Sequence, residues 1–367
     1  MISNTFCALP FVHSCTRVDG SSTPCCRFED SNFIEKTSPK AYFYSDKLAA
    51  VRTQMLEGKQ LTGCRKCYQE EELGRKSMRQ FANEDYLQYD IPKNTPIKFI
   101  EISFDNLCNM ACVPCATMDS SKWNEYVDII NYDNAFGGRL AECKNIDTIL
   151  DFSPVDYQST IKVNLLGGEP FLNVKNIDFL EKFNLQNIIF TTNTNCSIIP
   201  NKRWQNILKK IQSLHIKLSI DGINDIGAFS RYGVPWKQIE KTMDWFIDFK
   251  KTRNFTLSVH SMCHIFNVFD INNFEKYLQQ RNLRYKIDCV HGPAWLDIKI
   301  LPKKVKEQLI DHVKYDYVKQ YLIKNIDFVD EYNLDKFFLY ANRLQKRQHF
   351  VFVDNIVEEI MKWNGKA

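Results

Sequence analysis

Three cysteines stand close together at Cys108, Cys112 and Cys115, in the spacing C-x3-C-x2-C. Thiolates are common ligands of zinc and of iron–sulfur clusters, so this group indicates a metal site. Three thiolates suit three irons of a [4Fe-4S] cube. No fourth ligand follows nearby, which would leave the fourth iron open to a small molecule. The alternative is a zinc site that takes a remote fourth ligand.

Three more polar segments each end a predicted strand. They are Gly167-Gly168-Glu169-Pro170, Thr191-Thr192-Asn193-Thr194-Asn195 and Ser219-Ile220-Asp221-Gly222. Paired glycines let a backbone approach a ligand closely. Glu169 is suited to accept from an ammonium group, and the amides and hydroxyls of the second segment suit ribose hydroxyls. The active sites of barrels assemble at the carboxyl ends of their strands, so these segments and the cysteine loop are expected to meet there.

In this combination the sequence resembles the radical S-adenosylmethionine (radical SAM) enzymes, over roughly residues 96–300. The resemblance implies that the three cysteines ligate a [4Fe-4S] cluster and that the amine and carboxylate of SAM chelate its open iron. One-electron reduction would cleave SAM to a 5′-deoxyadenosyl radical, which abstracts a substrate hydrogen. Pro114 departs from the family pattern, because many members have an aromatic residue there, near adenine.

The resemblance also assigns roles to the polar segments. Gly167, Gly168 and Glu169 would hold the SAM amine, Asn193 and Asn195 would lie near the ribose, and Ser219 and Asp221 would lie near the ribose or the carboxylate. Two residues are weaker catalytic candidates. Arg231 either pairs with an anion of SAM or substrate or is a solvated loop residue. Cys263 either gives a hydrogen atom or is a buried thiol like Cys143, Cys196 and Cys289.

A second set of cysteines precedes the barrel, at Cys7, Cys15, Cys25, Cys26, Cys64 and Cys67. Their surroundings resemble the SPASM and twitch modules of radical SAM proteins, which hold auxiliary [4Fe-4S] clusters but normally follow the barrel. The resemblance suggests Cys7, Cys25, Cys64 and Cys67 as ligands, with Cys26 as the alternative to Cys25 and Cys15 as a spare thiol. A structural zinc ion in the same four thiolates is the alternative.

The elements that must position these residues alternate between strand and helix after about residue 96. The predicted strands are 97–104, 161–166, 187–192, 214–220, 255–262 and 284–290, with amphipathic helices such as 204–211 and 236–250 between them. Such alternation predicts an α/β fold with a parallel sheet, here a partial (β/α)6 TIM-like barrel. Residues 1–92 are expected to form an irregular cysteine-rich auxiliary-cluster segment with helices near 46–56 and from Cys67 through Glu72. Residues 93–300 are expected to form the barrel, with extra helices in the long link between its first two strands, and 301–367 a helical C-terminal extension.

The composition of the 367 residues is ordinary, with 44% apolar and 25% charged residues, which excludes a disordered chain. The net charge of +4 gives no strong signal for a nucleic-acid partner. No apolar run reaches the roughly 18 residues of a membrane span, and the first residues do not predict a signal peptide. An odd cysteine count in tight clusters argues against a disulfide framework and favours the cytoplasm.

The substrate expected first is a peptide or protein side chain, because the auxiliary cysteines resemble those of peptide- and protein-modifying members. A nucleotide or other small metabolite is the alternative within the family, and a non-catalytic zinc-binding scaffold is the alternative of another class. The scaffold explains the cysteines but not the three polar segments at strand ends. The family also implies a low-potential electron donor such as flavodoxin or ferredoxin.

Overall fold

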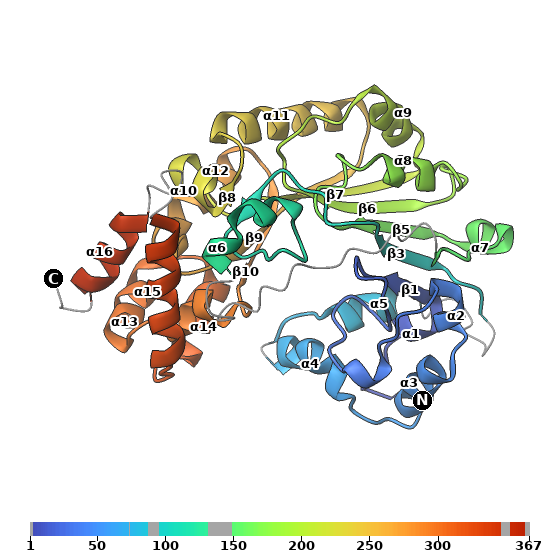
Figure 1. Cartoon of the computed structure of the whole chain (residues 1–367), viewed down its shortest axis with the longest axis horizontal. Coiled ribbons are helices and arrows are strands. Elements are labelled where there is room, and N and C mark those ends of the chain that lie inside the picture. The colour runs from blue at the N-terminus through green and yellow to red at the C-terminus, as the bar shows by residue number, and fades with distance from the viewer. Residues whose placement is uncertain (1–2, 73, 87–94, 131–148, 346–352, 364–367) are drawn as a thin grey trace. The chain divides into compact units, whose positions relative to one another are not determined.

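The six strands predicted from the sequence are all present in the computed structural model, which describes residues 3–72, 74–86, 95–130, 149–345 and 353–363 (Figure 1). They are β3 (Phe99–Ser103), β5 (Lys162–Leu166), β6 (Ile189–Thr194), β7 (Ser213–Ser219), β9 (Thr256–Cys263) and β10 (Arg284–Cys289). Along β5, β6 and β9, buried residues alternate with half-buried ones, so one face of each strand lies in the core. The α/β fold is confirmed.

The strands form an eight-stranded sheet in the order β10-β9-β7-β6-β5-β3-β1-β2. The pairs β3–β5, β5–β6 and β9–β10 are parallel. Helices join successive strands, as a parallel sheet requires. They include α8 (Val174–Leu180) after β5, α9 (Lys202–Lys210) after β6, α10 (Asn224–Ser230) and α11 (Trp236–Thr252) after β7, and α12 (Ile271–Gln280) after β9.

The expectation that residues 1–92 are irregular apart from two helices is wrong, because the segment also contains the helices α1 (Leu9–Val12), α2 (Pro39–Phe43) and α5 (Met78–Tyr86) and two short strands. β1 (His13–Thr16) is a strand that pairs in parallel with β3, and β2 (Ser22–Thr23) pairs with β1 in the antiparallel sense. β1 could not be predicted from the sequence because it is only four residues long and all four are buried. Such a strand shows no alternation of buried and exposed residues. The two predicted helices of this segment are confirmed as α3 (Asp46–Leu56) and α4 (Arg65–Glu72).

The chain divides into two compact units. The first contains Met1–Asn106, Ala141–Thr192 and Asn201–His215, and the second contains Leu107–Leu140, Asn193–Pro200 and Ile216–Ala367. Because β7 begins in the first unit and ends in the second, a strand-by-strand reading of the sequence does not reveal this division.

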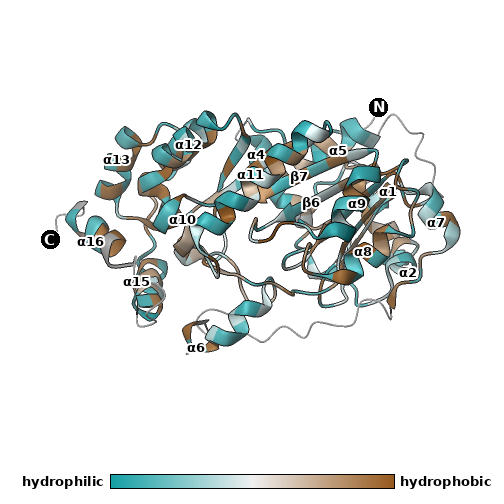
Figure 2. Ribbon diagram, turned by 90° about the horizontal axis from the view of Figure 1, so that it is seen from above, coloured by the Kyte–Doolittle hydropathy of each residue, from teal (hydrophilic) through white to brown (hydrophobic). Residues whose placement is uncertain are grey.

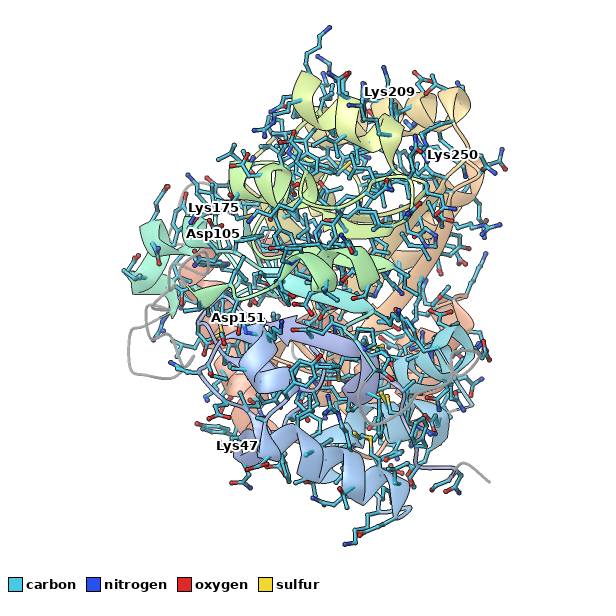
Figure 3. The ribbon with its side chains drawn as sticks, turned by 90° about the vertical axis from the view of Figure 1, so that its right-hand side faces the viewer. Lys47, Asp105, Asp151, Lys175, Lys209 and Lys250 are labelled. Carbon is cyan, nitrogen blue, oxygen red and sulfur yellow. The ribbon has the colours of Figure 1, made fainter. Side chains whose placement is uncertain are left out.

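In the first unit, aromatic side chains hold the helices against the sheet. The ring of Phe104 lies 5.4 Å from that of Phe179 on α8, and the ring of Phe190 stacks 6.3 Å from that of Trp204 on α9. Helix α9 buries this tryptophan and exposes Lys209, which is labelled in Figure 3. Figure 2 shows the same mixture of hydrophobic and hydrophilic residues around α9. The helix therefore covers the sheet with one face, as its amphipathic sequence predicts.

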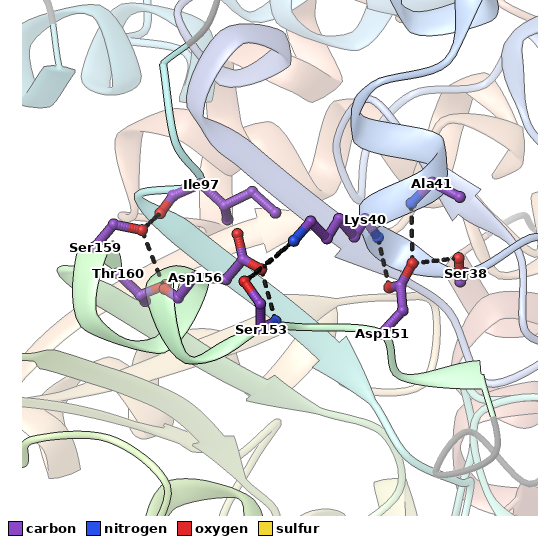
Figure 4. Close-up of polar contacts among 9 residues, drawn as sticks. All are labelled: Ser38, Lys40, Ala41, Ile97, Asp151, Ser153, Asp156, Ser159 and Thr160. Atoms are coloured by element: carbon purple, nitrogen blue, oxygen red, sulfur yellow. Dashed lines mark hydrogen bonds and ion pairs between the residues drawn. The ribbon is translucent and has the colours of Figure 1, made fainter.

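The N-terminal segment is tied to the rest of the first unit by polar contacts at α2 (Pro39–Phe43) (Figure 4). Asp151 accepts hydrogen bonds from the backbone N–H of Lys40, at 2.9 Å, and from the Ser38 hydroxyl. The Lys40 ammonium forms an ion pair of 2.9 Å with Asp156, at the start of α7 (Pro154–Ser159). The Asp156 side chain is nearly buried, so this pair holds α2 and α7 at a fixed spacing.

The second unit carries the predicted C-terminal helices, which are confirmed. They are α13 (Lys303–His312), α14 (Asp316–Lys324), α15 (Glu331–Gln345) and α16 (Val353–Trp363). Helix α15 packs through Phe337, whose ring lies 5.0 Å from that of Phe266. None of the helices in the described ranges is both long and apolar enough to cross a membrane.

The link between β3 and β5 contains extra helical turns, as its length predicts. The described parts are η3 (Ser121–Tyr126), α6 (Val127–Ile130) and α7. Cys143, which was expected to be a buried thiol, lies outside the described residues. The other three, Cys196, Cys263 and Cys289, are buried as expected.

Candidate functional site

The cysteine loop is fixed by hydrogen bonds from the 3-10 helix that follows it in the second unit. The Ser121 hydroxyl accepts from the backbone N–H of Cys108 at 3.1 Å, and the Ser120 hydroxyl donates to the carbonyl of Met110 at 2.5 Å. The buried indole of Trp123 donates to the carbonyl of Cys112 at 3.0 Å. Each contact pairs a backbone polar group of the loop, and the Cys112 carbonyl also accepts from the N–H of Cys115 at 3.0 Å, so the loop has a defined shape.

A two-stranded ribbon that the sequence did not reveal brings Arg231 to the loop. β4 (Ala111–Cys112) pairs in the antiparallel sense with β8 (Arg231–Tyr232), and Cys112 is opposite Arg231. Gly233 follows with φ +145°, and a Cβ there would lie 2.4 Å from the carbonyl oxygen of Asn109. Only glycine allows the two backbones to approach so closely. Two-residue strands leave no periodic signal, which is why this ribbon could not be predicted.

Arg231 is buried between a thiol and a carboxylate. Its Nη1 donates to Cys112 Sγ at 3.8 Å, and its Nη2 forms an ion pair of 2.8 Å with Asp221 Oδ2. Asp221 is 1% exposed, and its other oxygen accepts from the backbone N–H of Met262 at 2.8 Å. Burial opposes the charge of Arg231, but Asp221 and the thiols outweigh it and raise the pKa of the guanidinium. The interpretation of Arg231 as a solvated loop residue is therefore wrong.

The three thiols of the loop each have a polar neighbour. Asn195 Nδ2 donates to Cys108 Sγ at 3.5 Å and to the side chain of Asn109 at 3.1 Å. The Cys115 thiol donates a hydrogen bond to Cys112, which lowers the pKa of Cys112 despite burial, and Arg231 lowers it further. The same hydrogen bond and burial raise the pKa of Cys115. The lowered pKa of Cys112 favours the thiolate form that metals require. These residues fit a group that takes three thiolates.

The other predicted residues of the second unit are Asn193 and Ser219, at or next to the ends of β6 and β7. Both are half-buried. Cys263 lies on the buried face of β9, opposite Cys289 of β10, and the two thiols share a hydrogen bond. This placement favours the interpretation of Cys263 as a core thiol.

The Gly167-Gly168-Glu169 motif lies in the first unit and closes on the residues that precede the cysteine loop. Gly167 has φ +103°, and a Cβ there would lie 2.3 Å from the carbonyl oxygen of Asp105. The same carbonyl accepts from the N–H of Gly168 at 3.3 Å. Asn173 donates to the Asp105 carboxylate at 2.9 Å, and Figure 3 labels Asp105. The Glu169 carboxylate is 1% exposed and accepts from the N–H of Phe171 at 3.2 Å. The glycines therefore permit a close approach of two backbone segments.

The four predicted auxiliary ligands, Cys7, Cys25, Cys64 and Cys67, lie near one another in the first unit. Burial, followed by the influence of the other thiols, raises the pKa of Cys7. Burial also raises the pKa of Cys25 and of Cys64 to about 12. Ligands of one tetrahedral zinc ion would lie about 3.8 Å apart. In the described part of the chain, no three of these thiols are gathered that tightly.

The adjacent residues Cys25 and Cys26 belong to different surroundings. Cys25 interacts with Cys64 and Cys67, whereas the Cys26 thiol forms a hydrogen bond with the carboxylate of Glu101. Glu101 also belongs to a group that the sequence did not indicate, with His13 and Cys15. Only a prediction of the β1 strand, which the sequence did not provide, could have revealed this group, because the parallel register places Cys15 opposite Glu101.

Comparisons with known proteins give a limited similarity in sequence. No family model matches the chain. The GTP 3′,8-cyclase of Desulforamulus reducens is 23% identical over 159 residues, which are 41% of this chain and 44% of that protein. The chain thus matches less than half the length of this curated relative.

Among solved structures, anSMEcpe with bound AdoMet has a TM-score of 0.39 and 15% identity, over 61% of this chain and 62% of that one. SuiB of Streptococcus suis has a TM-score of 0.37 and 16% identity, over 87% of this chain and 69% of that one. Because both TM-scores are below 0.5, the α/β fold rests on the strands and helices of this chain itself.

Proposed function

We propose that this chain is a radical SAM enzyme. The observation that carries the proposal is the convergence of the thiols of Cys108, Cys112 and Cys115 beside the buried cation of Arg231. A sequence that places three cysteines within eight residues and no fourth one directly after them suits a [4Fe-4S] cluster with an open iron. The limited similarity to GTP 3′,8-cyclase and the polar segments at the strand ends also support the proposal of radical SAM activity.

The bound cluster would supply electrons for the reductive cleavage of SAM to methionine and a 5′-deoxyadenosyl radical. The chain holds the three thiolates in place through Asn195 at Cys108 and Arg231 at Cys112. Asp221 fixes the guanidinium of Arg231, because the two form a buried ion pair. Arg231 therefore acts as a positioning residue that offsets the negative charge of the thiolates.

The polar segments would hold SAM. We assign the amine to Gly167, Gly168 and Glu169, the ribose to Asn193 and Asn195, and the ribose or carboxylate to Ser219 and Asp221. The buried carboxylate of Glu169 is suited to an ammonium partner, since a buried charge is stabilised by an opposite one. Because Asp221 is already paired with Arg231, its role for SAM would be exerted through that pair.

The N-terminal cysteines would hold an auxiliary [4Fe-4S] cluster through Cys7, Cys25, Cys64 and Cys67. The influence of Cys64 and Cys67 on Cys25 favours Cys25 over Cys26 as the ligand, and a structural zinc ion in the same four thiolates is the alternative. Full ligation by four thiolates would suit electron transfer or a structural role. The electrons would come from a low-potential donor such as flavodoxin or ferredoxin.

The substrate proposed first is a peptide or protein side chain, on the strength of the auxiliary cysteines. A nucleotide is the alternative, and the name of the GTP 3′,8-cyclase supports it. Reaction mixtures with a candidate precursor peptide and with GTP would separate the two, because only the true substrate accelerates SAM cleavage and gains a change in mass.

The activity is tested by the formation of 5′-deoxyadenosine. The protein is reconstituted with iron and sulfide without oxygen, mixed with SAM and dithionite, and assayed by chromatography. The expected result is product from the wild type and from a Cys196→Ser control, which changes a buried thiol elsewhere in the second unit. The Cys108→Ala/Cys112→Ala/Cys115→Ala variant should give none. Zinc at both cysteine sets, with no iron uptake and no product, would overturn the proposal and favour the non-catalytic scaffold.

A further inference from the structure

A buried group of potential metal ligands lies on β1 and β3, apart from both predicted cluster sites. A ring nitrogen of His13, the thiol of Cys15 and a carboxylate oxygen of Glu101 all lie within 4.8 Å of one another. None of the three residues is more than 3% exposed. The register explains this proximity, since Cys15 is opposite Glu101 and His13 lies two residues earlier on the same face.

The imidazole of His13 independently points to a ligand. Both of its ring nitrogens are buried and lack a hydrogen-bond partner among the described residues, a costly arrangement for polar atoms. The carbonyl of Pro24 approaches the ring, but without the geometry of a hydrogen bond. The ring is also held by stacking on Phe99, with 4.2 Å between the centroids. A neutral, oriented imidazole with an unused lone pair is what a metal ion requires.

Glu101 is oriented in the way that ligating carboxylates usually are. Its Oε2 accepts a hydrogen bond from Asn164 Nδ2 at 2.8 Å. Its Oε1 accepts a hydrogen bond from the Cys15 thiol, with 3.2 Å between Sγ and Oε1. The Cys26 thiol also forms a hydrogen bond with this carboxylate. Hydrogen bonds from neighbouring residues commonly fix metal-binding carboxylates.

We propose that His13, Cys15, Cys26 and Glu101 bind a divalent transition-metal ion, and that Zn²⁺ fits this donor set best. Tetrahedral zinc with nitrogen, oxygen and sulfur ligands places the ligand atoms about 3.4–3.8 Å apart. The contact between Cys15 and Glu101 already has nearly this length, and the His13 nitrogen needs to move closer by at most about 1 Å. The ion would tie β1 and the residues after β2 to β3. This inference does not depend on the proposed function.

The proposal is tested on the full-length protein with its iron–sulfur sites reconstituted. The protein is exposed to Zn²⁺ without oxygen and desalted, and its zinc and iron are measured by mass spectrometry. About one zinc per chain should remain, and X-ray absorption at the zinc edge should show sulfur together with nitrogen and oxygen ligands. His13→Gln and Glu101→Gln should weaken zinc binding by more than about 100-fold and leave the iron content unchanged.

Three controls keep the result decisive. Cys196→Ser should retain zinc, because this buried thiol lies outside the group. Cys26→Ser changes an exposed residue, so it decides the question if either buried variant fails to fold. Circular dichroism identifies such failure. The absence of bound zinc, its retention by all three variants of the group, or a zinc ion with sulfur ligands alone would overturn the proposal.

Discussion

The two cysteine regions of the chain differ in the surroundings of one thiol, Cys112, since the hydrogen bond to Cys112 and burial raise the pKa of Cys115 in the same loop. In the loop, the thiols lie within residues 108–115, and Arg231 and Cys115 lower the pKa of Cys112. In the N-terminal segment, the thiols are spread from Cys7 to Cys67, and burial raises the pKa of Cys7, Cys25 and Cys64. Arg79 lowers the pKa of Cys64 but does not offset the effect of burial.

Because of this difference, the two sites should respond differently to the loss of their metal. The loop is shaped by hydrogen bonds and by a fixed cation, so it is prepared to receive a cluster. Burial raises the pKa of Cys7, Cys25 and Cys64, and a metal must replace the protons of these thiols, so folding and metal binding are coupled there. We therefore expect metal loss to affect activity through the loop and stability through the N-terminal segment.

The largest effect should come from removing the loop thiols. The Cys108→Ala/Cys112→Ala/Cys115→Ala variant should lose about four of about eight irons per chain, because one of two [4Fe-4S] clusters is gone. The N-terminal cluster and the melting temperature should change little. Iron and sulfide analysis with thermal melting checks this result. A variant that loses all its iron would show that the two sites are not independent.

The substitution Arg231→Gln should have the second-largest effect. The substitution leaves the buried carboxylate of Asp221 without its cation, and breaking a buried pair in this way costs about 3–5 kcal/mol. Urea unfolding measures the loss, and cluster loading at the loop should fall with it. The matched variant Arg231→Gln/Asp221→Asn removes both charges and should recover a large part of the stability. Equal stability of the single and double variants would contradict the role of this ion pair.

The adjacent cysteines of the N-terminal segment offer a sharper comparison. Cys25→Ser should reduce the iron bound at the N-terminal site, because Cys25 lies with Cys64 and Cys67. Cys26→Ser should leave iron unchanged, because this thiol lies with Glu101. Iron analysis of the two variants, prepared side by side, decides between them. The reverse pattern would make Cys26 the ligand.

The smallest effect should be a pH dependence of the metal-free protein. Cys25 and Cys64 have an ordinary pKa of 9.0, and burial raises it to about 12 in the folded state. The unfolded chain therefore releases these protons first, and stability should be complete below pH 9 and be lost as the pH rises towards 12. Urea midpoints measured across this range should fall less steeply in Cys25→Ser/Cys64→Ser. An equal decline in both proteins would mean that other groups cause it.

The sequence predicted the barrel well because its strands have strong signals. All six predicted strands and the C-terminal helices are present, since long alternating or amphipathic runs determine them. Short elements were missed. β1, β4 and β8 have between two and four residues, too few for periodicity to appear. Their pairing creates the contact between Arg231 and Cys112 and the group of His13, Cys15 and Glu101. Such contacts depend on register, which a single sequence does not specify.

The most direct test of the central claim is the electron paramagnetic resonance spectrum of the reduced protein, recorded with and without SAM. If SAM binds the cluster held by Cys108, Cys112 and Cys115, it should alter the spectrum of the wild type. The triple alanine variant, which keeps the N-terminal cysteines, should give a spectrum that SAM leaves unchanged. A wild-type spectrum that does not respond to SAM, or an equal response in the variant, would contradict the account.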